Sequence, residues 1–210
     1  MKGNGPTSWV WESALRSSLL CGVLLVLLAG TPALGEVFLS QQEALALAFP
    51  NADRIEKRSV VLDEAQTRAV EALSGAKLES RLVRIHEGFA GDERLGYALI
   101  DVHTVRTLPE AFMVVLSPQG VVETLRILAF YEPAEYKPTD RFLAQFGARA
   151  LGPELRLGGA IHGIAGSSLS ARAVTTGVRR SLALYEVLVR GNVDAVALGA
   201  RPRSAAAGGR

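Results

Sequence analysis

One long amphipathic helix near the carboxyl end constrains this chain more than any other feature. Apolar side chains recur at helical spacing between Ser170 and Val189, which predicts a helix of about that extent. Its expected core face consists of Val174, Val178, Leu182, Tyr185 and Leu188. Its expected solvated side carries Arg172, Arg179, Arg180 and Glu186. The folded part of the chain is therefore predicted to end in a helix with one buried face.

The loop that leads into this helix is a candidate site for a phosphate group. It is a run of small residues, Ala165, Gly166, Ser167 and Ser168. Backbone N–H groups in the first turn of a helix lack intrahelical partners, and the helix dipole favours negative charge there. Serine is also a common helix cap, so a plain N-cap formed by these hydroxyls is the alternative interpretation.

Shorter elements fill the rest of the chain. Helices are expected at residues 40–48, 63–73 and 139–146, with a capping box at Ser40 and Glu43. Strands are expected at residues 56–62, 82–86, 94–104, 112–116 and 121–131, with turns at residues 88–93 and 117–120. These elements predict an α+β fold, a small antiparallel sheet with packed helices.

The amino terminus has the pattern of an export signal. Lys2 and Arg16 precede the apolar run at residues 19–30, and small residues follow at 31–35. We expect residues 1–35 to be a cleaved signal peptide or a membrane anchor that directs export across the inner membrane. The folded part is then periplasmic, or anchored facing the periplasm. The remaining segments are expected to be a lead-in region at 36–94, a functional domain at 95–190 and a disordered tail at 191–210.

Composition excludes several kinds of chemistry. Cys21 is the only cysteine, so neither an internal disulfide nor a cysteine-based metal site is possible. The three histidines, His86, His103 and His162, lack ligand spacing, and we expect no metal. A net charge of +2 gives little support to nucleic-acid binding. Neither a nucleophilic triad nor a carboxylate pair is visible, so no catalytic residue is assigned.

Residues 166–175, GSSLSARAVT, resemble the flavinylation motif of FMN-binding domains. These domains occur in the sodium-pumping quinone reductase, in its ferredoxin-oxidising relative and in many exported bacterial flavoproteins. The family pattern is an Asp, a few residues, Ser/Thr-Gly-Ala-Thr and a Ser/Thr-rich helix start. Residues 96–122 and 132–146, the latter including Gln145-Phe146, are similar to the strands and helix that precede the motif in the family.

The resemblance implies FMN as the cofactor and Ser168 as the residue at the attachment position. In the family a separate flavin transferase joins FMN to the motif's threonine through a phosphoester bond. In this chain Ser167 stands where the family has alanine and His162 where it has aspartate. Covalent and non-covalent binding therefore both stay open.

Further contacts to FMN follow from placing its phosphate at Ser168. The backbone N–H groups of Leu169 and Ser170 would face the phosphate next to Gly166 and Ser167, and Arg172 would add a charge-assisted contact. His162 is a candidate for the phosphate or ribityl chain, with an ordinary solvated loop histidine as the alternative. Thr107 is a candidate to approach the isoalloxazine ring, with an ordinary strand connection as the alternative. Glu132 is a candidate to line either the ring site or a partner surface.

The resemblance implies an exported or membrane-anchored FMN-binding protein that relays electrons. Its expected partners are a flavin transferase and membrane or periplasmic redox proteins, with no nucleic acid. Two alternatives remain: a degenerate interaction module without flavin, and an extracytoplasmic flavin-dependent reductase.

Overall fold

The computed structural model describes residues 35–191 of the 210-residue chain. The expected signal or anchor and nearly all of the expected tail fall in residues 1–34 and 192–210, outside the described residues. Within residues 35–191, no helix is both long enough and apolar enough to cross a membrane.

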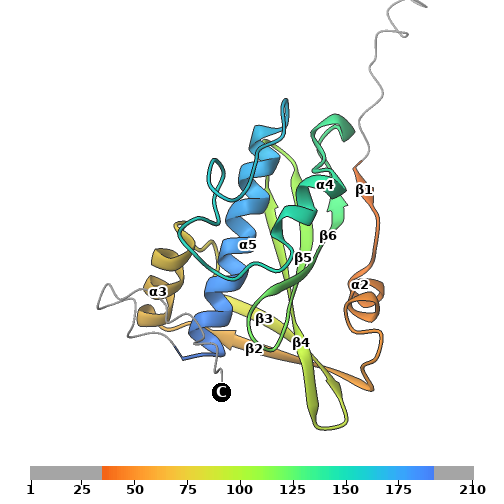
Figure 1. The fold of residues 1–210 in the computed structure, drawn as a ribbon, viewed down its shortest axis with the longest axis vertical. Helices are drawn as coiled ribbons and strands as arrows, with labels where there is room; N and C mark the ends of the chain where they lie inside the picture. Colours follow the sequence, from red (N-terminus) through yellow and green to blue (C-terminus); the bar gives the residue numbers. More distant parts are fainter. Residues whose placement is uncertain (1–34, 192–210) are drawn as a thin grey trace, which may run out of the picture. The chain divides into compact units, whose positions relative to one another are not determined.

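A single antiparallel sheet of six strands organises the described residues (Figure 1). Its order is β1-β6-β5-β4-β3-β2. The strands are β1 (Glu36–Val37), β2 (Arg54–Val61), β3 (Leu82–Ala90), β4 (Glu93–Thr104), β5 (Pro109–Leu116) and β6 (Val122–Phe130). The predicted α+β class with a small antiparallel sheet is confirmed. Strands from residues 36–94 and from residues 95–190 are members of the same sheet.

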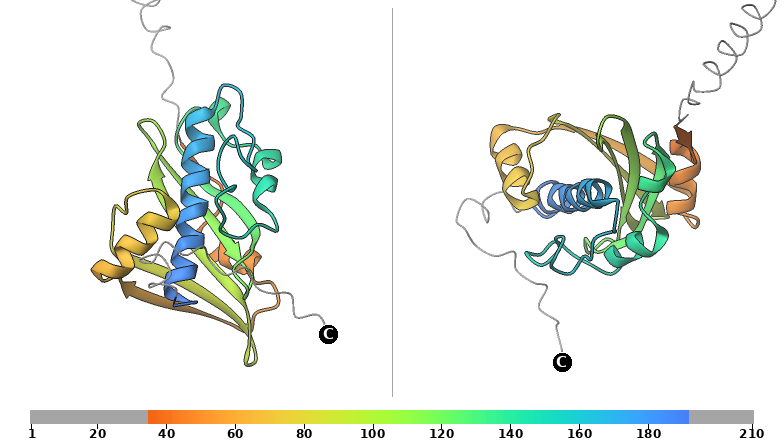
Figure 2. Two further views of the ribbon diagram at one scale, coloured as in Figure 1. Left: turned by 60° about the vertical axis from the view of Figure 1, so that its left-hand side comes forward. Right: turned by 90° about the horizontal axis from the view of Figure 1, so that it is seen from above.

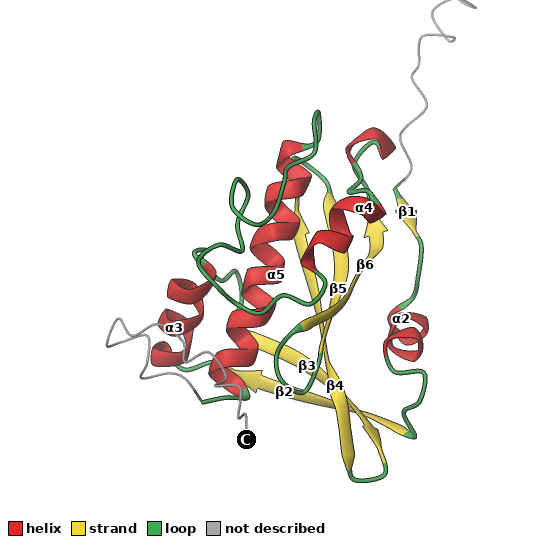
Figure 3. Cartoon of the chain, viewed as in Figure 1, coloured by secondary structure: helices red, strands yellow, loops and turns green. Residues whose placement is uncertain are grey.

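The helices lie where capping signals and apolar spacing place them (Figure 3). They are α2 (Gln41–Ala48), α3 (Glu64–Ser74), α4 (Asp140–Leu143) and α5 (Ser168–Leu188), with short 3-10 turns η1 (Ala134–Tyr136) and η2 (Ala144–Phe146). The capping box predicted at Ser40 and Glu43 is present. At the end of α3, Gly75 adopts the left-handed conformation with φ 76°, which favours glycine.

Helices cover both faces of the sheet, so the strands bury two separate apolar surfaces. One face packs against α5, with α3 on the far side of α5, and the other face packs against α2 (Figure 2). The strands supply both cores by alternation: Phe112 and Val114 of β5 face α5, whereas Met113 and Val115 face α2. The position of α5 is thus fixed by the side chains of the central strands.

Gly177 brings the middle of α5 unusually close to the sheet. A Cβ atom built on Gly177 would lie 2.4 Å from Cζ of Phe112 and 3.1 Å from Cγ of Asp101. Phe112 is fully buried, so its ring has little room to move away. The helix backbone therefore packs directly on Phe112, and only glycine fits at this position.

The predicted turn at residues 88–93 is too long. Strand β3 continues to Ala90, and the chain reverses at Gly91 and Asp92. Gly88 lies inside the strand because Phe49 packs across it: a Cβ atom there would lie 2.5 Å from Cγ of Phe49. In this sequence the glycine permits a close side-chain contact rather than a turn.

The prediction that four charged residues of α5 face solvent is wrong for three of them. The Arg179 guanidinium donates hydrogen bonds to carbonyl oxygens of α3 and of the loop before α5, Leu73, Ser74, Gly152 and Leu155. Arg180 pairs with Asp101 of β4, and Glu186 is buried and paired with Arg190. Only Arg172 is exposed as expected. Helix α5 is enclosed on most sides, so these charges are held by protein groups instead of water.

We expect Gly177→Ala to lower the free energy of unfolding by about 1–3 kcal/mol, because the added methyl group would overlap the Phe112 ring. In an exposed helix the same change stabilises by about 1 kcal/mol, so the sign of the effect is diagnostic. Urea unfolding followed by circular dichroism measures it. Gly163→Ala is the control, since a Cβ atom there meets nothing within 4 Å. A stabilised Gly177→Ala protein would contradict the close approach.

Candidate functional site

Three segments meet at the amino-terminal end of α5, and together they contain all of the predicted cofactor-binding residues except Arg172. They are the β4–β5 loop (residues 105–108), the segment after β6 (132–136) and the loop and first turn leading into α5 (162–170). We call this region the α5 N-terminal site (Figure 1). Arg172, the remaining predicted residue, lies one turn further along α5.

The segment after β6 connects the other two. Ser167 Oγ donates a hydrogen bond to the Glu135 carbonyl oxygen at 3.1 Å. The Arg106 guanidinium lies over the Tyr136 ring, 5.1 Å from its centroid. The Thr107 N–H donates to Glu132 Oε1 at 2.7 Å. The structure thus brings Thr107 and Glu132 into direct contact, and links Ser167 to the same segment through Glu135.

The first turn of α5 has no side-chain cap. Ser167 is the N-cap residue, but its hydroxyl donates to Glu135 and accepts no hydrogen bond from the helix. The alternative in which Ser167 caps the helix is therefore wrong. Gly166 precedes it with φ 80° and nothing within 4 Å of a Cβ position, so the backbone is open there. The backbone N–H groups that begin α5 are left without a side-chain acceptor.

The side chains of the first turn differ in exposure. Ser168 is exposed, and Leu169 is an exposed apolar residue with 48% of its surface accessible. Ser170 is 1% exposed, and its Oγ has no hydrogen-bond partner among the described residues. The exposed residues place a hydroxyl and an apolar side chain next to each other at the mouth of the helix.

Glu132 holds the β4–β5 loop in one conformation. Its Oε1 accepts hydrogen bonds from the backbone N–H groups of Arg106, Thr107 and Leu108, at 3.0, 2.7 and 2.9 Å. The bonds from Thr107 and Leu108 hold the pKa of the Glu132 carboxyl below its usual value. Glu132 is buried beneath the loop, so it positions Thr107 instead of projecting into the site.

Gln145 holds the loop before α5 in one conformation, as Glu132 does for the β4–β5 loop. Its Oε1 accepts from the His162 backbone N–H at 2.8 Å, and its Nε2 donates to the His162 carbonyl oxygen at 3.1 Å. The two bonds fix the backbone at residue 162 and leave the His162 side chain exposed. Sequence reasoning noted Gln145 only as part of a resemblance and missed this role.

A buried ionic cluster lies between α5 and the central strands, and sequence reasoning missed it. His103 Nδ1 is 2.8 Å from Asp101 Oδ1, and His103 Nε2 is 3.2 Å from Glu110 Oε2. Arg180 Nη1 donates to Asp101 Oδ2 at 2.8 Å. The sequence signal that could have revealed the cluster is the two-residue spacing of Asp101 and His103. On a strand this spacing puts both side chains on the same face of the sheet as buried Leu99.

The electrostatics of the cluster favour a charged histidine. Burial alone would lower the pKa of His103, but its hydrogen bonds to Asp101 and Glu110 outweigh burial and raise the pKa to about 9. Burial raises the pKa of Glu110, and the bond to His103 opposes that rise. At neutral pH the protonated imidazole therefore bridges Asp101 of β4 and Glu110 of β5.

Neither the cluster nor any other group of His, Cys, Asp and Glu within residues 35–191 is arranged to hold a metal ion. Comparisons with protein-family models and with curated proteins find no match to this chain.

We expect the stability of the protein to fall as the pH rises from 7 to 9.5, through deprotonation of His103. Its folded-state pKa of about 9 lies above the ordinary value of 6.5, so its contribution is complete below pH 6.5 and is lost as the pH passes 9. The loss amounts to about 3 kcal/mol. Urea unfolding at successive pH values measures the slope, and an NMR titration of the His103 ring measures the pKa directly.

The matched variants are His103→Gln, which should remove the slope, and His162→Gln, which should keep it because that side chain is exposed. An NMR pKa near 6.5 for His103 would contradict the ion pairs.

Proposed function

We propose that this protein binds FMN at the α5 N-terminal site and relays electrons outside the cytoplasm. The observation that carries the proposal is the uncapped first turn of α5, in which free N–H groups stand beside the exposed Ser168 hydroxyl. The sheet and helices are, in this proposal, those of an FMN-binding domain. The motif resemblance at residues 166–175 supports it independently of the geometry.

The phosphate of FMN fits the helix terminus. The N–H groups of Leu169 and Ser170 have no side-chain acceptor, and a dianionic group there would also meet the positive end of the helix dipole. Arg172 lies one turn further on and is exposed, so its guanidinium is free to reach the phosphate. Gly166 leaves room for the phosphate to approach the backbone.

The isoalloxazine ring needs an apolar and rigid surface next to the phosphate. Leu108 and Leu169 are 38% and 48% exposed, and both belong to the α5 N-terminal site. Glu132 holds the loop that carries Thr107 and Leu108, so the surface is formed before a ligand arrives. FMN, when bound, supplies the redox chemistry, and the protein sets its position and exposure.

The exposed Ser168 hydroxyl is accessible to a flavin transferase. Such an enzyme would transfer the FMN group from a flavin dinucleotide to Ser168 Oγ, so that the pyrophosphate bond breaks as the phosphoester forms, the hydroxyl loses its proton and a nucleoside monophosphate leaves. We propose that the amino-terminal segment exports the protein to where such transferases act. The redox partners are then membrane or periplasmic proteins.

Protein purified from its exporting host should be yellow, with FMN fluorescence. If the link is covalent, the fluorescence persists through denaturing electrophoresis in the wild type and is absent in Ser168→Ala, while Thr176→Ala retains it. Mass spectrometry of the peptide that contains Ser168 checks the attachment directly. Colourless wild-type protein from a host that contains the transferase would overturn the proposal in favour of a flavin-free interaction module.

We expect Glu132→Ala to weaken FMN binding about tenfold or more, because three backbone N–H groups lose their shared acceptor and the loop loosens. Quenching of FMN fluorescence measures the affinity, and hydrogen exchange at residues 106–108 measures the loop. Glu135→Gln is the control, since that side chain is exposed on the same segment. Unchanged affinity with a loosened loop would remove the β4–β5 loop from the binding site.

A further inference from the structure

The outer edge of β6 is paired at both ends and free in the middle. At one end the N–H groups of residues 38 and 39 donate to the Leu128 carbonyl oxygen, at 2.8 and 3.2 Å. At the other end the Val122 N–H donates to the Arg149 carbonyl oxygen, and the Val122 carbonyl oxygen accepts from the Ala148 N–H, both at 2.8 Å. Between these two points, no strand within residues 35–191 pairs with the outer edge of β6.

Two residues have backbone groups that face this gap. Odd-numbered residues of β5 direct their N–H and C=O groups to β6, because Ser117 bonds to Val121 and Pro109 bonds to Tyr131. Their partners Thr124 and Arg126 therefore face β5, and the register shifts beside Val122 and Ile127 leave Leu125 and Ile127 facing outward. Within residues 35–191, no backbone or side-chain partner reaches the outward groups of Leu125 or Ile127. Four strong hydrogen-bonding groups are thus available in a row.

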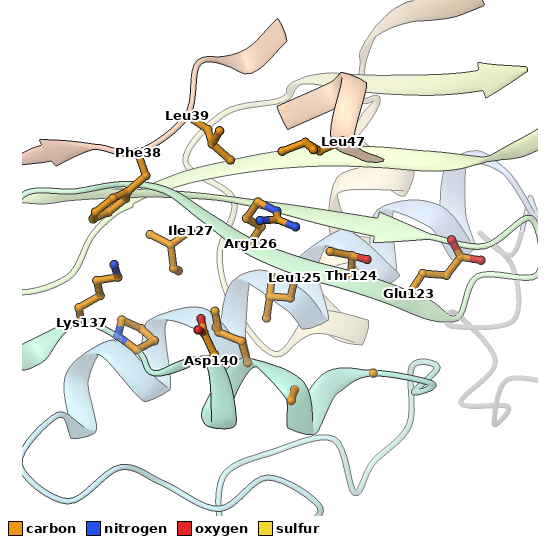
Figure 4. Close-up of a pocket in the computed structure, with 14 residues that line it drawn as sticks. Phe38, Leu39, Leu47, Glu123, Thr124, Leu125, Arg126, Ile127, Lys137 and Asp140 are labelled. Carbon is orange, nitrogen blue, oxygen red and sulfur yellow. The ribbon is translucent and has the colours of Figure 1, made fainter. Parts of the chain in front are cut away.

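A groove of about 650 Å³ runs along this free edge (Figure 4). Leu39 and Leu47 form the wall on the α2 side, and Leu143 and Ala144 form the wall on the α4 side. Leu47 is 54% exposed although it is a large apolar residue. The groove therefore combines apolar walls with a floor of unpaired backbone.

We propose that this groove binds an extended segment of another polypeptide, which adds a strand to β6 in line with β1. Strand β1 already pairs with β6 at Val37 and Ala129, so the position of an added strand is set by the existing sheet. An extended peptide matches the spacing of the Leu125 and Ile127 backbone groups, whereas a lipid chain would leave them unpaired. The walls from α2 and α4 restrict the occupant to a single strand.

Charged side chains give the segment a direction. Lys137 lies at the Phe38 end, with its Nζ 3.7 Å from the centroid of the Phe38 ring, and Glu123 lies at the other end (Figure 4). In the described part of the chain, neither Lys137 nor Glu123 forms a salt bridge. Arg126 and Asp140, of opposite charge, also line the groove between these two ends. A segment with an acidic residue near Lys137, a basic residue near Glu123 and uncharged residues between them complements the groove.

The probe is a library of fluorescent seven-residue peptides with Val, Ile or Leu at alternate positions, Thr or Ser between them, and Glu and Lys at opposite ends. Fluorescence anisotropy with the full-length protein selects binders, and amide hydrogen exchange then locates them. The expected result is that the Leu125 and Ile127 amides exchange rapidly in the free protein and at least tenfold more slowly with peptide. The Thr124 and Arg126 amides, which face β5, should be slow in both states.

Ala144→Trp should fill the groove and weaken peptide binding at least tenfold, whereas Arg141→Trp, an exposed α4 position outside the groove, should leave it unchanged. N-methylation of the peptide nitrogens that face β6 should abolish binding. If no peptide protects Leu125 and Ile127, the proposal fails. Slow exchange of both amides without peptide, or dimerisation that Ala144→Trp prevents, would overturn it in favour of the chain's own segment or a second copy.

Discussion

The direct contact between the α5 backbone and the Phe112 ring sets the geometry of the whole described fold. A glycine at residue 177 lets the helix sink toward the central strands, and the surrounding side chains are then enclosed on most sides. That enclosure explains why Arg179 and Arg180 of α5 bond to protein groups instead of water. It also fixes the axis of the helix, and therefore the direction in which its first turn presents N–H groups to solvent.

The ionic cluster beneath α5 is a consequence of the same enclosure. Asp101, His103 and Glu110 are shut off from water, so each charge depends on its neighbours. Burial and hydrogen bonding act on His103 in opposite senses, and the bonds to two carboxylates prevail. Such a cluster confers little net stability over an apolar core, but it disfavours any shift of α5 along the sheet that would separate Arg180 from Asp101.

Local signals in the sequence predict where helices and strands lie better than they predict which groups each side chain contacts. The capping box at Ser40, the helix expected at residues 63–73 and the long helix expected at residues 170–189 follow from short-range rules, and the structure confirms them to within two residues at each end. Arg179 and Arg180 could not be assigned in this way, because helical periodicity assumes that charges face water. Gly88 was misread because a glycine that opens a turn and one that admits an aromatic ring look alike in sequence. The roles of Glu132 and Gln145 depend on contacts across at least 17 residues, which no local pattern encodes.

The Arg179 guanidinium has a further consequence for how the molecule holds together. It joins the last carbonyl groups of α3 to the loop at residues 152–155, so one side chain of α5 bonds to two regions almost 80 residues apart in sequence. Helix α3 belongs to the segment that looked like a lead-in, yet its carboxyl end is closed by a residue of the carboxyl-terminal helix. Local opening of α3 or of the loop at residues 152–155 therefore breaks hydrogen bonds to the same side chain of α5, which couples the stability of these segments to that of the helix.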